Sequence, residues 1–325
     1  MTNRSDEESR VGGQAVVEGV MMRSPVGSAV AVRTSKGEIV ARHLDMDRLC
    51  DRGGIWKKPV FRGAAMLVDT LRLGMKALNW SAAVAEDPGK TGDGSGSGSG
   101  LATVLAVLTA VVLFAWLPLQ SSKWILSGAD SPAGQFSVHL LAGGFRLVAF
   151  LLYIMAISLL PDVRRLFVYH GAEHQTIHAW EGGLEPLPEQ AVTQSPLHQR
   201  CGTSFLLLVM LATILFYAVI DSLMILAVGV NPQAHVRILY HIPLIPFVMG
   251  ISYEILRVAD RHLETSRLAR YVTAPGLLMQ RLTTRKAGRE EVAVAIASLR
   301  VSLGEDPGPD VRMADAGSGA GEVRE

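Results

Sequence analysis

The sequence predicts a mainly α-helical, polytopic membrane protein with about four transmembrane helices and a small N-terminal α+β cytoplasmic region. Apolar residues make up 49% of the 325 residues, and the mean hydropathy of +0.28 is too high for an ordinary soluble protein. The apolar residues cluster into four runs of about the length that crosses a bilayer as a helix. Four such runs are difficult to bury in a soluble core.

The N-terminal cytoplasmic region is expected over residues 12–85. Short strands at 29–33 and 38–42 flank the turn Ser35-Lys36-Gly37, which predicts a β-hairpin. From Val60 to Ser81 apolar residues recur at helical spacing. This spacing predicts an amphipathic helix on the bilayer surface or on the helix bundle, and a helix in the core of a soluble domain is an equally good interpretation.

A glycine-rich stretch, Gly12–Arg23, precedes the hairpin. Its glycines allow sharp turns or close backbone approach, and Gln14, Glu18 and Arg23 are polar groups among apolar ones. The stretch has neither the Gly-Lys-Ser/Thr of a phosphate-binding loop nor the Rossmann spacing. We interpret it as a structured loop of unknown role.

The helical membrane domain is expected over residues 101–270, after a flexible linker at 86–100 that ends in repeated Gly-Ser. Two prolines are expected to kink the fourth span, and Asp221 ends the third span unless the membrane tolerates it. The four predicted spans are residues 101–119, 141–160, 205–220 (or to about 228) and 238–256.

Basic residues near the ends of the spans predict the orientation. The loop 162–202 carries Arg164, Arg165 and Arg200, and four arginines follow the fourth span, whereas the other loops between spans carry one or two basic residues. We therefore expect a multi-pass protein of the cell membrane, with the lipid bilayer as its partner and the N- and C-termini in the cytoplasm. The net charge of +1 argues against nucleic acid, and no apolar stretch that would make a signal peptide follows the polar N-terminus.

The segment Tyr169–His174, which reads Tyr-His-Gly-Ala-Glu-His, carries the strongest chemical signal. A helix over 162–181, continuing from the second span, would place His170 and His174 on one face, within reach of one metal ion. The order His-x-x-Glu-His is also the spacing of inverted zinc peptidases, in which the carboxylate is the general base. At 100° per residue, five side chains of the types that bind metals fall within an arc of roughly 140° on this helix. They are Glu173, His170, Glu181, His174 and His178.

A second cluster, His198-x-x-Cys201, precedes the third span at the same membrane face. Thiolate and imidazole together are a common ligand set for zinc, so a divalent transition metal, zinc in the first place, is the expected cofactor. A site of two histidines and one carboxylate would leave a position for water and suit hydrolysis. A closed structural site would instead use the four ligands His170, His174, His198 and Cys201, and the sequence leaves both arrangements open.

Two carboxylates are the candidate catalytic residues. Glu173 lies between the two histidines in sequence, and Glu254 ends the fourth span at the same face. An ionisable group at a membrane span is a functional candidate, although Glu254 is expected to pair with Arg257 or a histidine more readily than to bind metal. Asp221 and His241, near the opposite face, are weaker candidates of the same kind.

The C-terminal cytoplasmic region is expected over residues 271–303. Ala274-Pro275-Gly276 is expected to break the chain, and residues 290–303 are expected to form a short helix. The tail 304–325 is expected to be disordered. The two cysteines, Cys50 and Cys201, make no disulfide framework.

At these motifs the chain resembles the YqhQ-like family of bacterial membrane proteins, a domain of unknown function whose members are described as predicted metal-dependent enzymes. The resemblance supports His170, Glu173, His174, His198, Arg200, Cys201 and Glu254 as the site, whereas His178 is not part of the family pattern. Near the C-terminus Ala287 and Ala293 stand where the family usually has proline and glutamate. The matching motifs are Gly12–Met22, Arg62-Gly63, Tyr169–His174, His198–Phe205, Gly250–Glu254, and Pro275-Gly276-Leu277 followed by Gln280 and Leu282–Thr284.

Three functions are compatible with the sequence. The first is a metal-dependent, hydrolase-like enzyme at the cytoplasmic face, in which His170 and His174 hold zinc and Glu173 moves a proton. The second is a non-enzymatic membrane protein with a structural or metal-handling His/Cys site. The third is a membrane scaffold that docks partners through its N-terminal region.

Overall fold

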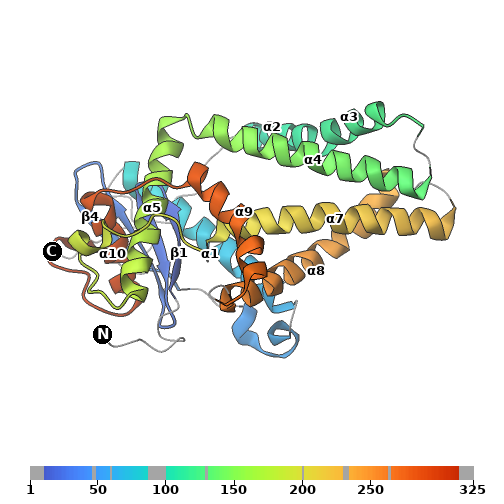
Figure 1. Cartoon of the computed structure of the whole chain (residues 1–325). Helices are drawn as coiled ribbons and strands as arrows, with labels where there is room; N and C mark the ends of the chain where they lie inside the picture. The colour runs from blue at the N-terminus through green and yellow to red at the C-terminus, as the bar shows by residue number, and fades with distance from the viewer. Residues whose placement is uncertain are drawn as a thin grey trace.

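The computed structural model describes residues 11–45, 49–58, 61–86, 100–128, 131–199, 201–229, 234–262 and 265–314. It confirms a mostly helical protein with a small sheet near the N-terminus. Long helices form a bundle, and the sheet and its covering helices lie at one end of that bundle (Figure 1).

The sheet has five strands in the order β1-β2-β3-β4-β5. Its first four strands are antiparallel, and β3 and β4 form a hairpin where the sequence predicted one. The last strand comes from the C-terminal end of the chain and pairs in parallel with β4, with Ile39 opposite Val311. The strands are β1 (Gly12–Val16), β2 (Gly19–Arg23), β3 (Ser28–Arg33), β4 (Ile39–His43) and β5 (Val311–Met313).

Two expectations from the sequence differ from the structure here. The glycine-rich stretch Gly12–Arg23 is the β1–β2 hairpin rather than a loop. Because β2 is buried along most of its length, its residues do not alternate between apolar and polar, and alternation is the signal by which a strand is read. The tail expected to be disordered contains β5, which is too short to show a pattern of its own; residues 315–325 lie outside the described part.

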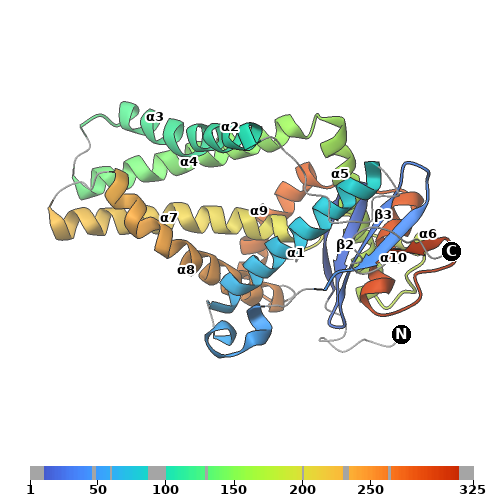
Figure 2. The same ribbon diagram turned by 180° about the vertical axis from the view of Figure 1, so that it is seen from behind.

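Helices cover the two faces of the sheet. On one face, the core joins β2 and β3 residues to Leu73, Ala77 and Trp80 of α1 (Phe61–Glu86). Figure 2 shows α1 running from beside α8 across this face. On the other face pack α5 (Pro161–Glu181), α6 (Pro188–Ala191) and α10 (Arg289–Ser302). Two short 3-10 helices precede α1, η1 (Leu49–Arg52) and η2 (Gly54–Lys57).

Four long apolar helical segments form the bundle, and they suggest a membrane protein. The segments Val104–Ile125, Ala133–Ile157, Leu207–Val228 and Leu239–Ala259 are long and apolar enough to cross a membrane. In the 18-residue apolar window of each segment only 6% to 22% of the residues are buried inside the protein, so apolar side chains are left to meet lipid. They belong to α2 (Gly100–Val111), η3 (Val112–Trp116), α3 (Leu117–Ile125), α4 (Pro132–Ile157), α7 (Gly202–Val228) and α8 (Ala234–Arg261).

The helix that carries the histidines does not continue from the second span as expected. The last turn of α4 ends at Ile157, and α5 starts at Pro161, after an extended Leu160. Proline has no amide hydrogen, and it forces the preceding residue out of the helical conformation. The chain therefore turns sharply, and α5 lies against the sheet instead of extending the bundle (Figure 1).

The break expected at Pro275 is also absent, because α9 (Arg267–Thr283) runs through it. Its buried residues Thr273, Gly276 and Met279 pack on the bundle across the proline, and this packing outweighs the one helical hydrogen bond that proline cannot make. The predicted linker at 86–100 lies almost wholly outside the described residues; α1 ends at Glu86 and α2 begins at Gly100.

Candidate metal centre

Two histidines of α5 and one cysteine before α7 form a compact group. One ring nitrogen of His170, one of His174 and the sulfur of Cys201 all lie within 4.8 Å of one another. The two imidazoles stand one helical turn apart, with ring centroids separated by 4.4 Å. His174 and Cys201 are buried, and His170 is partly buried.

Backbone carbonyls fix the orientation of both imidazoles. The Nδ1 atom of His170 lies 2.8 Å from the carbonyl oxygen of Thr283, and the Nδ1 atom of His174 lies 2.6 Å from the carbonyl oxygen of Pro196. A carbonyl oxygen only accepts, so Nδ1 carries the proton in each ring and Nε2 keeps its lone pair. The His170 Nε2 atom lies 3.2 Å from Cys201 Sγ. This pattern is the one that metal-binding histidines usually show.

The Nε2 atom of His174 is a polar atom of this group that lies in the protein interior. It is buried and makes no hydrogen bond of normal geometry to the residues that the structure describes; a weaker contact with the Cys201 thiol lies beside it. Burial lowers the pKa of His174, although the neighbouring Cys201 thiol acts in the opposite direction. A buried nitrogen without a normal hydrogen bond costs about 1–3 kcal/mol, and a metal ion held with His170 and Cys201 would remove this cost. The donor set, two imidazoles and one thiol, suits zinc.

Glu173 lies beside this group on the side of α5 that faces β1. Its side chain is buried, and burial raises the pKa of its carboxyl group to about 8, although His170 and a backbone hydrogen bond from Gly13 act to lower it. A side chain at Gly13 would place its Cβ 3.1 Å from the Glu173 carboxyl carbon and 2.5 Å from the Met21 carbonyl oxygen. Gly13 therefore lets β1 approach the site closely, a role that the sequence did not reveal.

The turn after β1 also contacts α5 through side-chain interactions. Glu18 adopts a positive φ of 51° in this turn. One of its carboxylate oxygens pairs with Arg165, and the other accepts a hydrogen bond of 3.3 Å from the Tyr169 hydroxyl. The β1–β2 hairpin is thus part of the wall around the centre, and Glu18 and Arg165 are site-building residues that motif reading left without a role.

His198 lies next to the group, but its side chain contacts Glu181. Its Nε2 atom is 3.2 Å from Glu181, and its ring lies 5.7 Å from that of His174 and 4.6 Å from that of His178, measured between centroids. The side-chain amide of Gln280 holds the His198 backbone through two hydrogen bonds. The Gln280 oxygen accepts from the His198 N–H at 2.9 Å, and the Gln280 nitrogen donates to the His198 carbonyl at 2.7 Å. His178 thus lies close to the centre, whereas Arg200 lies outside the described residues.

Glu254 is held by the N-terminal region. Its two carboxylate oxygens accept hydrogen bonds of 2.6 and 2.5 Å from the Arg62 guanidinium group. This contact raises the pKa of Arg62 above its usual value. The partner seen is therefore Arg62 of α1, where the sequence suggested Arg257 or a histidine. Glu254 is not part of the compact His/Cys group.

Comparison with known sequences gives the family. A family model described as "Protein of unknown function (DUF1385)" matches residues 58–305, which is more than half of the chain. The chain belongs to this family. It is also 32% identical over 304 residues to "Uncharacterized protein YqhQ" of Bacillus subtilis (strain 168), an alignment that covers 90% of this chain and 92% of the relative. The resemblance to YqhQ-like proteins is thereby confirmed, and no solved structure matches significantly.

This DUF1385 protein has a second polar cluster, inside the bundle. The buried carboxylate of Asp221 lies 2.9 Å from His241 Nε2 and 3.2 Å from His139 Nε2, and it also accepts a hydrogen bond from the Tyr240 hydroxyl. Arg237 lies 3.8 Å from the same carboxylate. Motif reading singled out Asp221 and His241 but missed His139 and Arg237, which lie just outside the predicted spans.

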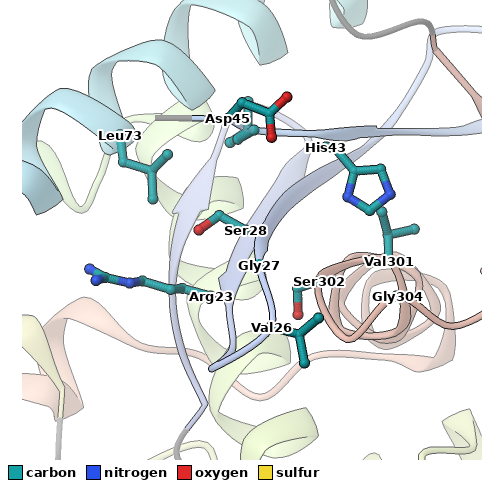
Figure 3. Close-up of a pocket in the computed structure, with 11 residues that line it drawn as sticks. Arg23, Val26, Gly27, Ser28, His43, Asp45, Leu73, Val301, Ser302 and Gly304 are labelled. Carbon is teal, nitrogen blue, oxygen red and sulfur yellow. The ribbon is translucent and has the colours of Figure 1, made fainter. Parts of the chain in front are cut away.

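A cavity of about 250 Å³ lies elsewhere, between one end of strands β2, β3 and β4 and the end of α10 (Figure 3). Arg23, His43 and Asp45 supply its ionisable side chains, and Ser28 and Ser302 supply two hydroxyl groups. None of its lining residues belongs to the His/Cys group or to the acids predicted from the sequence. The cavity is therefore separate from the candidate metal centre.

Proposed function

We propose that this DUF1385 protein is a metal-dependent, hydrolase-like enzyme of the cell membrane, with its centre at the cytoplasmic face. The observation that carries the proposal is the convergence of His170, His174 and Cys201, in which the buried Nε2 of His174 makes no hydrogen bond of normal geometry to the described residues. A zinc ion held by these three residues would have room for a water molecule, as catalytic zinc sites do and closed structural sites do not.

The residues of the centre would have different roles: metal ligands, a proton carrier, and carbonyls that orient the ligands. His170, His174 and Cys201 would hold a divalent transition metal, zinc in the first place. When bound, such an ion would supply Lewis-acid chemistry that makes water nucleophilic near neutral pH. The positive charge of a bound ion would lower the raised pKa of Glu173, which is buried beside the ligands. The Glu173 carboxylate would then take the proton of the attacking water and return it to the leaving group. Thr283 and Pro196 would keep the two imidazoles in the ligating tautomer.

The proposed orientation combines sequence and fold. The described N-terminal strands, the α5–α6 segment and α10 with β5 pack together at one end of the bundle, and two apolar helices separate each piece from the next. All three pieces thus belong on one side of a membrane. The arginines near the ends of the apolar helices support the cytoplasm as that side.

A closed structural or metal-handling site is the alternative. The observation that favours it is the position of His198, whose ring lies beside that of His174 and which could serve as a fourth ligand. X-ray absorption spectroscopy of the metal-loaded protein separates the two readings. Two nitrogens, one sulfur and an exchangeable oxygen support the enzyme, whereas three nitrogens and one sulfur support the closed site.

Metal content is the primary test. Detergent-purified wild-type protein is expected to carry about one transition-metal ion per chain, and the His170→Ala/His174→Ala variant is expected to lose it, as measured by elemental mass spectrometry. His43→Ala/His262→Ala removes two exposed histidines and should retain the metal. If wild-type protein binds no stoichiometric metal even after reconstitution with zinc, manganese and iron, the proposal fails.

The role of Glu173 has its own prediction. Glu173→Gln keeps the size of the side chain but removes its capacity to carry a proton, so metal content should be unchanged while turnover falls at least about 100-fold. The measurement is a screen of chromogenic esters, amides and phosphoesters, followed by rate comparison on any substrate that the wild type hydrolyses. Full activity of the variant on such a substrate would show that Glu173 moves no proton.

A further inference from the structure

We propose that α9 is an interfacial helix that binds anionic lipid headgroups at the membrane face next to the sheet. Its apolar side would enter the bilayer surface, and its arginines would contact the headgroups. The proposal depends on the membrane location of the four apolar helices, but it does not depend on the metal centre or on catalysis.

The first observation is that α9 has an exposed apolar stripe away from the side that the protein covers. Ala269, Thr273, Gly276 and Met279 are buried, and α9 packs against α7 and α8. Away from this side, Leu268, Tyr271 and Leu278 are 71%, 74% and 63% exposed. At 100° per residue these three exposed side chains fall within an arc of about 80°. Large apolar side chains gathered on one exposed stripe indicate a binding surface.

The second observation is the charge beside this stripe. Arg267, Arg270 and Arg281 are exposed, and they occupy an adjoining arc of about 60° on the helix. The sequence of α9 contains neither aspartate nor glutamate. An apolar stripe with a cationic border is typical of helices that lie in the interface of an anionic leaflet, and the tyrosine in the stripe suits the headgroup level.

The third observation is continuity with the apolar helices. In Figure 1, α9 runs across the ends of α7 and α8 rather than along them. Few residues in the apolar segments of these two helices are fully buried. The exposed stripe of α9 therefore lies at the end of the surface that would meet lipid. A lipid leaflet covers both surfaces at once, which makes it a better occupant than a soluble protein or a second copy of the chain.

The covered side of α9 and the residues after it hold the candidate metal centre. Gln280 clamps the backbone of His198, and the carbonyl of Thr283, the last residue of α9, orients His170. The lipid surface and the centre thus lie on different sides of one helix, whose diameter is about 10 Å. Binding of α9 to headgroups would fix the height of the centre close to the leaflet surface.

Fluorescence quenching tests the apolar stripe. The full-length variants Tyr271→Trp and Met313→Trp are reconstituted into vesicles of phosphatidylcholine and phosphatidylglycerol, with or without brominated acyl chains. Bromine should quench the added fluorescence of Trp at position 271 at least twofold, and should leave that at position 313, in β5, unchanged, with wild-type fluorescence subtracted. Equal quenching at the two positions would overturn the proposal. Protection of position 271 from bromine that increases with protein concentration would also overturn it, because a second copy of the chain would then cover the stripe.

Lipid selectivity tests the arginines. Spin-labelled phosphatidylglycerol and phosphatidylcholine are compared by electron spin resonance for their fraction immobilised on the protein. Each arginine near an anionic surface contributes about a fivefold preference, so Arg267→Gln/Arg281→Gln should lower the selectivity for phosphatidylglycerol severalfold. Lys36→Gln/Arg289→Gln removes two exposed cations from the sheet side and α10 and should not. Unchanged selectivity in the first variant would overturn the headgroup assignment.

Discussion

Gly171→Ala is expected to lower the free energy of unfolding by about 3 kcal/mol and to release the metal. The added Cβ would lie 1.7 Å from the carbonyl oxygen of Arg285, and a backbone atom cannot rotate away. The segment that crosses α5 at this point must therefore move. It includes the Thr283 carbonyl that orients His170 and the Arg285 amide that bonds to Phe167. Thermal unfolding and metal content of the purified variant check both effects.

Gly144→Ala is the matched control. Gly144 lies inside α4 and has nothing within 4 Å of the position of an added Cβ. Alanine is favoured over glycine in a helix by up to about 1 kcal/mol, so this variant should unfold at the wild-type temperature or above it and keep its metal. Indistinguishable behaviour of the two variants would contradict the close crossing at Gly171.

Asp221→Asn is expected to have the largest effect within the bundle. The substitution removes a fully buried carboxylate that lies within 4 Å of Arg237, His139 and His241. Breaking a buried charge pair from one side leaves a buried charge without compensation and costs roughly 3–5 kcal/mol. The variant should therefore unfold at a distinctly lower temperature in detergent, and α4, α7 and α8 should exchange amide hydrogens faster.

Glu189→Gln serves as the comparison for Asp221→Asn. The Glu189 side chain is 59% exposed, and its carboxylate lies 3.8 Å from the 71% exposed Arg289. Surface pairs of this kind contribute at most about 1 kcal/mol. Its unfolding temperature should stay near that of the wild type. A similarly small change in Asp221→Asn would show that the cluster is solvated and contributes little to the packing of the bundle.

Local patterns in the sequence predicted the helical bundle and the histidine pair. Long apolar runs mark helices because their length and composition are properties of single segments. The spacing of His170 and His174 likewise depends only on the periodicity of one helix. The structure adds Cys201 to this pair, and its place before the third predicted span had brought it into the candidate set.

Contacts between distant segments could not be predicted in this way. The carbonyls that orient His170 and His174 belong to Thr283 and Pro196. Every residue has a backbone carbonyl, so residue type does not indicate which carbonyl will accept such a hydrogen bond. The pairing of Glu254 with Arg62 joins residues 192 positions apart. The approach of Gly13 to Glu173 depends on β1, whose strand character was hidden by glycines. Each of these contacts depends on tertiary packing rather than on local propensity.

The position of α10 and β5 at the end of the chain has a consequence for biogenesis. The first four strands leave the ribosome early, and α1 follows directly to cover one of their faces. The other face, with Val20, Met22 and Ala31, is covered by α5 and α10, which are synthesised only after two and four of the apolar helices. The nascent chain must therefore keep this face from aggregating throughout membrane insertion. A chaperone that shields it, or delayed folding of the sheet, becomes a requirement for making the protein.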